Sequence, residues 1–395
     1  MQHYDAIILG AGAAGLMAAA TAGQRGRRVL VVDHAEAPGK KILISGGGRC
    51  NFTNNGTTPD RFLSANPHFA KSALGRYTPA DFLALVEAHG IAWHEKTLGQ
   101  LFCDGSARQI VEMLLDECDR ATRSGGLVDI ALGKPVDGVT HDGNAFHVER
   151  SGAAFTAPRL IVATGGPSIP KMGATGYAYD LARQFGLKVI EPRPALVPLT
   201  LGGEETLFRS LSGVASDVVA RSGKTRFREA ALFTHRGLSG PAILQVSSYW
   251  RHGEPVGVDF VPDQEPDWLL AAKRAAPRTS PRRVLAQVLP DRLAETLAER
   301  LALPAELGLA TDKALAAAQA KLADWPFHPN GSEGYAKAEV TVGGVSTAGL
   351  SSRTMEAKAV PGLHFVGEAV DVTGWLGGYN FQWAWASGRA AGEAV

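Results

Sequence analysis

The sequence predicts an α/β fold in which the two ends of the chain build one parallel sheet and a second domain is inserted between them. Three observations carry this prediction. A strand, a glycine-rich turn and a helix follow one another near the N-terminus, and the same order recurs near the C-terminus. The 395 residues also exceed the size at which a single hydrophobic core usually stops growing.

The N-terminal segment has the pattern of a nucleotide site. Ala6–Leu9 is a continuous apolar run, typical of a strand buried on both faces. Gly10, Gly12 and Gly15 follow with GxGxxG spacing, and Asp33 ends the next strand. Such glycines let the backbone turn and bring a pyrophosphate to a helix N-terminus, while the carboxylate accepts hydrogen bonds from ribose hydroxyls. The acid disfavours a 2′-phosphate, so the pattern favours FAD or NAD over NADP.

The second glycine-rich turn favours FAD, because this elongated cofactor needs a second anchor. Residues 361–392 read as strand, turn and helix, with Gly367 and Glu368 at the strand end. We expect Glu368 to bind a ribityl hydroxyl, and the N–H groups around Gly377 to face the flavin N1–C2=O edge. A further strand at 159–164 ends in two glycines, and strand-ending loops of a parallel sheet gather where ligands bind.

The chain resembles the HI0933-like (YhiN-type) flavoproteins, a family of NAD(P)/FAD-dependent oxidoreductases. The strings that carry the resemblance are GAGAAGLMAA, GKKILISGGGRCNFTN, LIVATGG, FTHRGLSGPAIL, VTVGGV and GEAVDVTGWLGGYN, in family order along nearly the whole chain. The resemblance implies an FAD-binding, Rossmann-like domain of the two-dinucleotide-binding type with an insert. Some relatives resemble bile-acid reductases that act on conjugated enones.

In this architecture the GGGRCN segment is expected to pass under the FAD. The run Gly46–Gly48 would allow close backbone contact, and Ser45 or Arg49 would hold phosphate or the charge of the reduced flavin. Cys50 has two interpretations: a small buried apolar residue, or a redox-active thiol beside the ring. His235 also has two: a proton donor to the substrate, or a loop histidine that caps backbone groups.

Two sets of site residues follow. The catalytic candidates are His235 and Cys50. The residues expected to bind the cofactor are Gly10, Gly12, Ala13, Ala14, Gly15, Asp33, Lys41, Ser45, Gly46, Gly47, Gly48, Arg49, Cys50, Asn51, Ala163, Thr164, Gly165, Gly166, Gly367, Glu368, Asp371, Gly377, Gly378, Tyr379 and Asn380. No spacing predicts a metal site.

The pattern of apolar residues divides the chain into two predicted domains. Residues 1–190 and 338–395 are assigned to the FAD-binding domain, and residues 191–337 to the insert. Within the first part, 60–123 has helical apolar spacing and 127–157 reads as a small β-meander. The insert is β-rich over 195–262 and helical over 265–325.

The composition bounds partners and location. A net charge of +1 argues against a large basic nucleic-acid face, although residues 268–290 contain five basic and no acidic side chains. We interpret that run as a solvated surface more readily than as an anion-binding one. Three cysteines without a CxxC fit a reducing cytoplasm. The uncharged stretch 6–23 is interrupted by glycines, so it is not expected to span a membrane.

The leading functional prediction is an FAD-dependent oxidoreductase. It would reduce a small molecule with an activated, enone-type double bond, using electrons from NADH or NADPH that docks transiently. Two alternatives stay open: a flavoprotein that modifies RNA or tRNA, and a non-catalytic redox sensor. The sequence leaves the substrate, the electron donor and the oligomeric state undefined.

Overall fold

The computed structural model describes residues 2–395, which divide into two compact units. Unit 1 consists of residues 2–193 and Val340–Val395, and unit 2 of Pro194–Glu339. The division falls close to the predicted domain boundaries. The functions assigned to the two domains stay predictions.

A five-stranded parallel sheet forms the centre of unit 1. Its order is β22 (Leu363–Phe365), β12 (Leu160–Val162), β2 (Ala6–Leu9), β3 (Arg28–Val32) and β8 (Leu127–Ala131), and every neighbouring pair is parallel. Every residue of β2, β12 and β22 is buried, as their continuous apolar runs predict. The α/β prediction is confirmed, and the loops after β2, β3, β12 and β22 leave the same edge of the sheet.

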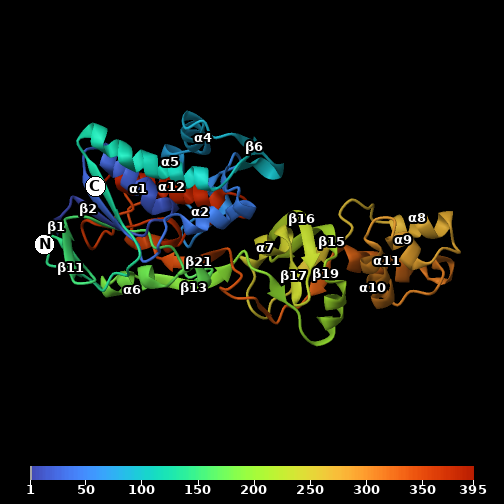
Figure 1. Ribbon diagram of the computed structural model, residues 1–395. Coiled ribbons are helices and arrows are strands. Elements are labelled where there is room, and N and C mark those ends of the chain that lie inside the picture. The colour runs from blue at the N-terminus through green and yellow to red at the C-terminus, as the bar shows by residue number, and fades with distance from the viewer. Residues whose placement is uncertain (1) are drawn as a thin grey trace. The chain divides into compact units, whose positions relative to one another are not determined.

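Three helices of unit 1 pack side by side: α1 (Ala13–Gln24), α5 (Arg108–Asp119) and α12 (Tyr379–Gly392) (Figure 1). The contact between α1 and α12 is close because their facing residues are small. A Cβ added at Gly388 would lie 2.4 Å from the Ala14 carbonyl oxygen. The C-terminal helix is thereby fixed on the helix that opens the nucleotide site.

The residues between β3 and β12 depart from the sequence prediction in two places. Residues 138–157 do form a meander of β9 (Gly138–His141), β10 (Phe146–Arg150) and β11 (Ala153–Ala157), which β1 (Gln2–His3) joins. The sequence predicts that β8 belongs to this meander as well. In the structure β8 pairs with β3 and therefore belongs to the parallel sheet. The stretch 60–123 is not uniformly helical, since it contains β5 (Phe62–Leu63), β6 (Trp93–Glu95) and β7 (Gln100–Cys103).

The other elements of unit 1 frame the central sheet. They are α2 (Lys40–Ile44), β4 (Asn51–Asn54), α3 (Lys71–Arg76), α4 (Pro79–Ala88), α6 (Tyr177–Gln184), β13 (Val189–Ala195), β21 (Val340–Val345) and β23 (Thr373–Gly374). β4, β7 and β6 form a three-stranded sheet, β23 pairs with β5, and β13 pairs with β21. The first of these sheets places the glycine-rich segment after α2 beside the C-terminal turn.

Unit 2 combines an antiparallel sheet with a helical group (Figure 1). The sheet runs β19 (Trp325–Phe327), β18 (Val256–Asp259), β15 (Ala215–Ser222), β16 (Thr225–Phe233), β17 (Gly237–Ser239), β14 (Leu199–Thr200) and β20 (Gly331–Ser332). Its helices are α7 (Pro241–Ser247), α8 (Trp268–Ala275), α9 (Pro281–Leu285), α10 (Asp291–Leu301) and α11 (Asp312–Ala323). Phe208, Phe233, Phe260 and Phe327 pack in its core.

Residues 2–395 contain neither a membrane-spanning helix nor a metal-binding cluster. None of the helices there is both long and apolar enough to cross a bilayer. No group of three or more His, Cys, Asp or Glu side chains in that range is arranged to hold a metal ion.

Candidate functional site

The turn between β2 and α1 forms an open cradle. Gly10 has φ +109°, and a Cβ at Gly15 would lie 1.9 Å from the Gly10 carbonyl oxygen, so both positions require glycine. Gly12, the N-cap of α1, has no heavy atom within 4 Å of the place a Cβ would take. No side chain caps α1 and no acid lies in its first turn. Its N–H groups and positive dipole end therefore face open space, as a pyrophosphate requires.

Asp33 is held in place at the end of β3 by two backbone donors. Ala11 N–H donates to Asp33 Oδ2 over 2.7 Å, and Ala35 N–H donates to Asp33 Oδ1 over 2.8 Å. The side chain keeps 16% of its surface exposed. Each carboxylate oxygen has capacity for another hydrogen bond, which fits the predicted contact with ribose hydroxyls.

A polar cluster joins three segments that are distant in sequence. Lys41 Nζ donates to Ser168 Oγ over 2.6 Å and lies 2.7 Å from Glu368 Oε2. Ser168 Oγ donates to Glu368 Oε1 over 2.8 Å, and Thr341 N–H donates to the same oxygen over 3.0 Å. The carboxylate of Glu368 thus accepts bonds from its own chain at both oxygens, and its predicted ribityl contact stays a prediction.

Two hydroxyls around this cluster are buried without a partner. The Oγ1 atoms of Thr164 and Thr341 make no hydrogen bond within residues 2–395. Gly166 lies against the cluster, because a Cβ there would be 2.8 Å from Thr341 Oγ1 and 3.1 Å from Glu368 Oε1. Buried hydroxyls normally have partners, so these two favour a polar ligand at this edge of the sheet.

The glycine run between α2 and β4 is a left-handed turn. Gly46, Gly47 and Gly48 have φ values of +56°, +67° and +85°, which side chains other than glycine rarely adopt. A Cβ at Gly46 would meet the ring of Phe102 at 2.6 Å, whereas one at Gly47 would meet nothing within 4 Å. The turn therefore packs on β7 on one side and is open on the other, which fits close approach to a flat ligand.

Cys50 follows this turn, and its thiol is fully buried. Burial raises its pKa to about 12, although a hydrogen bond with Ser45 opposes the shift. Since a thiolate is the reactive form of cysteine, the environment favours the packing interpretation over the redox one. Cys103 and Cys118 are also free and buried.

The C-terminal turn lies directly on β4. A Cβ at Gly378 would be 2.4 Å from the Thr53 carbonyl oxygen, and Asn54 Nδ2 donates to the Gly377 carbonyl over 2.8 Å. Asn380 closes the turn, with Gly374 N–H donating to its Oδ1 over 2.8 Å. The two glycine-rich segments that the sequence predicts at one site are thus neighbours.

Two predicted residues serve the chain in other ways. Asp371 Oδ2 accepts a hydrogen bond from Ala65 N–H over 2.9 Å, and burial raises the pKa of this carboxyl. His235 lies in unit 2, in the exposed loop between β16 and β17, so it is not among the residues that unit 1 brings together.

An aromatic and cationic pair beside the C-terminal turn escaped the sequence analysis. The backbone N–H of Trp375 donates to the Arg61 carbonyl over 3.1 Å. The Arg61 guanidinium carbon lies 5.4 Å from the centre of the Trp375 ring. Arg61 Nη1 also donates to the Tyr379 hydroxyl. The position of Trp375 within GWLGGYN could have marked it as a site residue. No sequence pattern marks Ser168, because only the fold brings this residue to Glu368.

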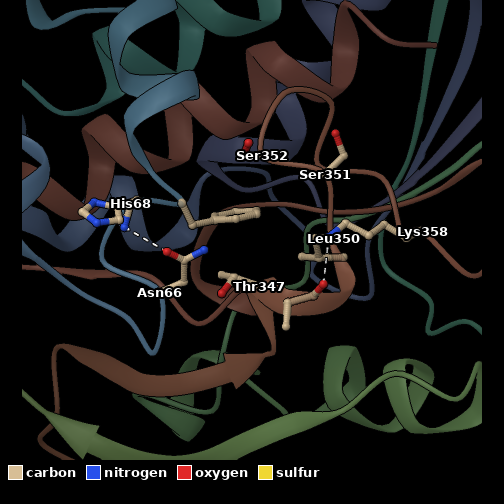
Figure 2. A pocket seen from close by; sticks show the side chains of 9 residues that line it. Asn66, His68, Thr347, Leu350, Ser351, Ser352 and Lys358 are labelled. Carbon is tan, nitrogen blue, oxygen red and sulfur yellow. Dashed lines mark hydrogen bonds between the residues drawn. The ribbon is translucent and has the colours of Figure 1, made fainter.

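A separate cavity of about 480 Å³ lies in unit 1 between the segment after β5 and the segment after β21 (Figure 2). Its lining is mostly polar and includes no carboxylate: Asn66, His68, Phe69, Thr347, Ala348, Leu350, Ser351, Ser352 and Lys358. Lys358 Nζ donates to the Ala348 carbonyl over 2.9 Å. None of the predicted site residues lines it.

Taken as a set, the residues of unit 1 fit FAD. The open N-terminus of α1 suits its pyrophosphate, Asp33 suits its ribose, and the unpartnered hydroxyls of Thr164 and Thr341 suit a polar chain that crosses the sheet edge. Of the two glycine-rich turns, the one at Gly46–Gly48 has open space at Gly47, which suits the close approach of a ring system.

Comparisons with known proteins agree with this assignment. The sequence model of the HI0933-like protein Rossmann domain matches residues 4–394. The chain is 52% identical over 402 residues to a ribosomal RNA dihydrouridine synthase of Escherichia coli, covering 100% of this chain and 98% of that protein. It is 31% identical to a 3-dehydro-bile acid delta(4,6)-reductase of Clostridium scindens, covering 98% of each.

One solved structure shares the fold over most of its length. It is a 3-ketosteroid-delta4-(5alpha)-dehydrogenase of Rhodococcus jostii in complex with 4-androstene-3,17-dione, with a TM-score of 0.52 at 13% identity. The alignment covers 99% of this chain and 96% of that one. At this identity the likeness is one of fold.

Proposed function

The chain belongs to the HI0933-like family of FAD-dependent oxidoreductases, and on that premise we propose that it reduces uridine in ribosomal RNA to dihydrouridine. The observation that carries the proposal is the 52% identity, across the full length of both chains, to a protein named for this reaction. RNA modification is one of the functions that the sequence leaves open, and this identity favours it over the reduction of a small molecule.

The proposed reaction agrees with the double-bond chemistry that the sequence predicts. The C5=C6 bond of uracil is conjugated with the C4 carbonyl, so C6 is the electrophilic carbon of an enone-type system. A hydride adds to C6 and a proton to C5, which together convert uracil to its dihydro form. FAD supplies the hydride when bound, and NADH or NADPH is the expected source of the two electrons.

The side chains of unit 1 would hold the cofactor in the proposed enzyme. The N–H groups at the start of α1 would bind the pyrophosphate, and Asp33 the ribose. The ammonium of Lys41 is paired with Glu368 and bonded to Ser168, and its remaining N–H would donate to the cofactor at the sheet edge. These groups are held by hydrogen bonds within unit 1, so they are oriented before a ligand arrives.

Trp375 is the proposed platform for the uracil base. A nucleotide must leave its stack before an enzyme can act on its base, and unstacked bases bind to aromatic side chains. The indole is half-buried, and the Arg61 guanidinium packs over it. It also stands three residues before Gly378, in the turn that lies on β4.

The proton for C5 requires an acid, and the two predicted candidates differ. Cys50 is unsuited, because its thiol is buried and its raised pKa makes it a poor proton donor. The exposed imidazole of His235 stays a candidate. His235→Gln should lower the rate of dihydrouridine formation without changing the rate at which nicotinamide reduces the flavin; equal loss of both would remove this role.

A second candidate function is the reduction of a small conjugated enone. The observation in its favour is the 31% identity to the bile-acid reductase, at a similar coverage. A redox sensor without turnover is the third. The three differ in what reoxidises the reduced protein under anaerobic conditions: ribosomal RNA, a small enone, or neither.

The test is the formation of dihydrouridine in ribosomal RNA. Purified protein with FAD, NADPH or NADH, and ribosomal RNA lacking this modification would be incubated without oxygen, and nucleosides then analysed by mass spectrometry. We expect dihydrouridine only with protein, flavin and nicotinamide together. Absence of dihydrouridine, from a protein whose flavin is reduced, would refute the proposal.

A further inference from the structure

The helical part of unit 2 carries a basic surface that the proposed cofactor site does not use. Residues 268–290, which include α8 and α9, contain five basic side chains and no acidic one. Two of the five are engaged within the chain. Lys273 Nζ lies 2.8 Å from Asp312 Oδ1 and donates to the Ala310 carbonyl over 2.7 Å, and Arg282 Nε lies 3.9 Å from Glu295 Oε1.

The other three basic residues, Arg274, Arg278 and Arg283, are exposed and make no ion pair within residues 2–395. Other arginines of unit 2 are paired with acids: Arg228 lies 2.6 Å from Asp263, and Arg221 pairs with Asp324. The segment itself has no acid, and although Asp312 of α11 offsets part of the charge near Lys273 and Arg274, the three guanidiniums concentrate positive charge in a protein whose net charge is only +1.

Helix stability explains only part of this arrangement. Arg274 lies in the last turn of α8, where a cation interacts favourably with the helix dipole. Arg278 lies in the turn between the helices, and Arg283 lies in the last turn of α9, a helix of five residues. Arg278 has no helix end to explain its charge, and its exposed guanidinium is available to an external anion.

An exposed apolar side chain lies in the segment that is bonded to the turn between α8 and α9. Leu309 keeps 71% of its surface exposed. Its segment is fixed to the turn between α8 and α9, because Gly308 N–H donates to the Pro277 carbonyl over 2.7 Å and Leu307 N–H donates to the Thr279 carbonyl over 2.9 Å. Leu309 therefore adds an exposed apolar side chain to the part of unit 2 that carries the arginines.

We propose that the surface formed by Arg274, Arg278, Arg283 and Leu309, here called the α8–α9 surface, docks the phosphate backbone of the ribosomal RNA substrate. This inference rests on the proposed function, because it assigns a binding surface to that substrate. Guanidiniums bind phosphate oxygens through paired N–H donors, and each phosphate contact releases counterions, so such binding weakens as salt rises. A local docking surface of this kind is compatible with a near-neutral net charge, whereas a uniformly basic face is not.

The test compares two charge-matched triple variants of the full-length holoprotein. R274Q/R278Q/R283Q removes the α8–α9 arginines, and R221Q/R226Q/R228Q removes three arginines from β15 and β16 of the same unit. Binding of labelled ribosomal RNA would be measured by filter retention over a series of salt concentrations. Flavin content, and flavin reduction by nicotinamide without RNA, would show that both variants are folded.

The first variant should bind ribosomal RNA about 10- to 1000-fold more weakly near 0.1 M salt, and its slope of log affinity against log salt should fall by about 2 to 3. The matched variant should stay within about threefold of the wild type. Equal weakening in both variants would overturn the proposal, because net charge alone would then explain it. Unchanged binding in the first variant would also overturn it.

The outcome separates this proposal from the function on which it rests. A wild-type protein that forms dihydrouridine, together with a first variant that binds RNA normally, would remove the α8–α9 surface and leave the proposed function standing. A wild-type protein that neither binds ribosomal RNA nor forms dihydrouridine would refute the proposed function, and the docking surface with it.

Discussion

Substituting Gly12 by alanine separates the stability of unit 1 from its affinity for FAD. Gly12 adopts φ −87° and ψ −167°, an extended conformation that alanine tolerates. A Cβ there would meet no protein atom within 4 Å. The added methyl group instead enters the open space before the first N–H groups of α1, where the pyrophosphate is expected to lie.

The two expected effects differ in size. Alanine is a poorer N-cap than glycine, which lowers the free energy of unfolding by about 0.5–1 kcal/mol. Alanine also reduces the conformational entropy of the unfolded chain, which raises the free energy of unfolding by about 0.4–1 kcal/mol. The melting temperature of the apoprotein should therefore change by only a few degrees. The loss of one charge-assisted hydrogen bond to phosphate costs about 1.5–3 kcal/mol, which corresponds to roughly 10- to 100-fold weaker FAD binding.

The assay is FAD titration of apoprotein, followed by flavin fluorescence, beside a thermal melt of the same samples. Gly75→Ala is the matched control, because a Cβ at Gly75 also meets nothing within 4 Å but lies in α3, outside the predicted site. Gly15→Ala is the opposite case, since its Cβ would overlap the Gly10 carbonyl oxygen, and it should not fold. FAD affinity of Gly12→Ala within twofold of the wild type would refute the placement of the pyrophosphate at α1.

Three further predictions concern the polar cluster, the buried thiol and the indole. Glu368→Gln removes the charged partner of Lys41 and should weaken FAD binding about tenfold or more. In a double-mutant cycle, the combined effect of Glu368→Gln and Lys41→Met on FAD binding should be smaller than the sum of the two single effects. Cys50 should resist alkylation at pH 8 until the protein unfolds, because its pKa is raised to about 12, and Cys50→Ala should keep turnover; rapid labelling of the folded protein would contradict this. Trp375→Ala should raise the KM for ribosomal RNA about tenfold, with Trp375→Phe close to the wild type, whereas an equal KM in both would remove the stacking role.

The part of the site that local patterns encode could be predicted from the sequence. Ala6–Leu9 is apolar throughout because β2 is buried on both faces, and the glycines after it are spaced by the geometry of a strand-to-helix turn. Asp33 ends the neighbouring strand at the same edge, so its place followed from the parallel topology. These features depend on residues close to one another in the chain.

The rest depends on contacts between distant segments, for which the sequence has no local signal. Ser168 joins Lys41 and Glu368 only because β12 and β22 are neighbours in the sheet. The sequence predicts Leu127–Ala131 in the meander, whereas the strand pairs with β3, because its alternation suits an edge strand of either sheet. The binding partner is harder still to predict from the sequence, because a docking surface consists of exposed side chains that the packing of the core does not constrain.

The most direct measurement uses the anaerobically reduced holoprotein as its own indicator. Protein reduced with one equivalent of nicotinamide would be mixed with unmodified ribosomal RNA, with a flavin absorbance record and a nucleoside analysis of the same sample. We predict that the oxidised flavin band returns on mixing and that dihydrouridine forms in equal amount to the flavin reoxidised. A flavin that stays reduced with RNA but is reoxidised by a small conjugated enone would contradict the proposed substrate.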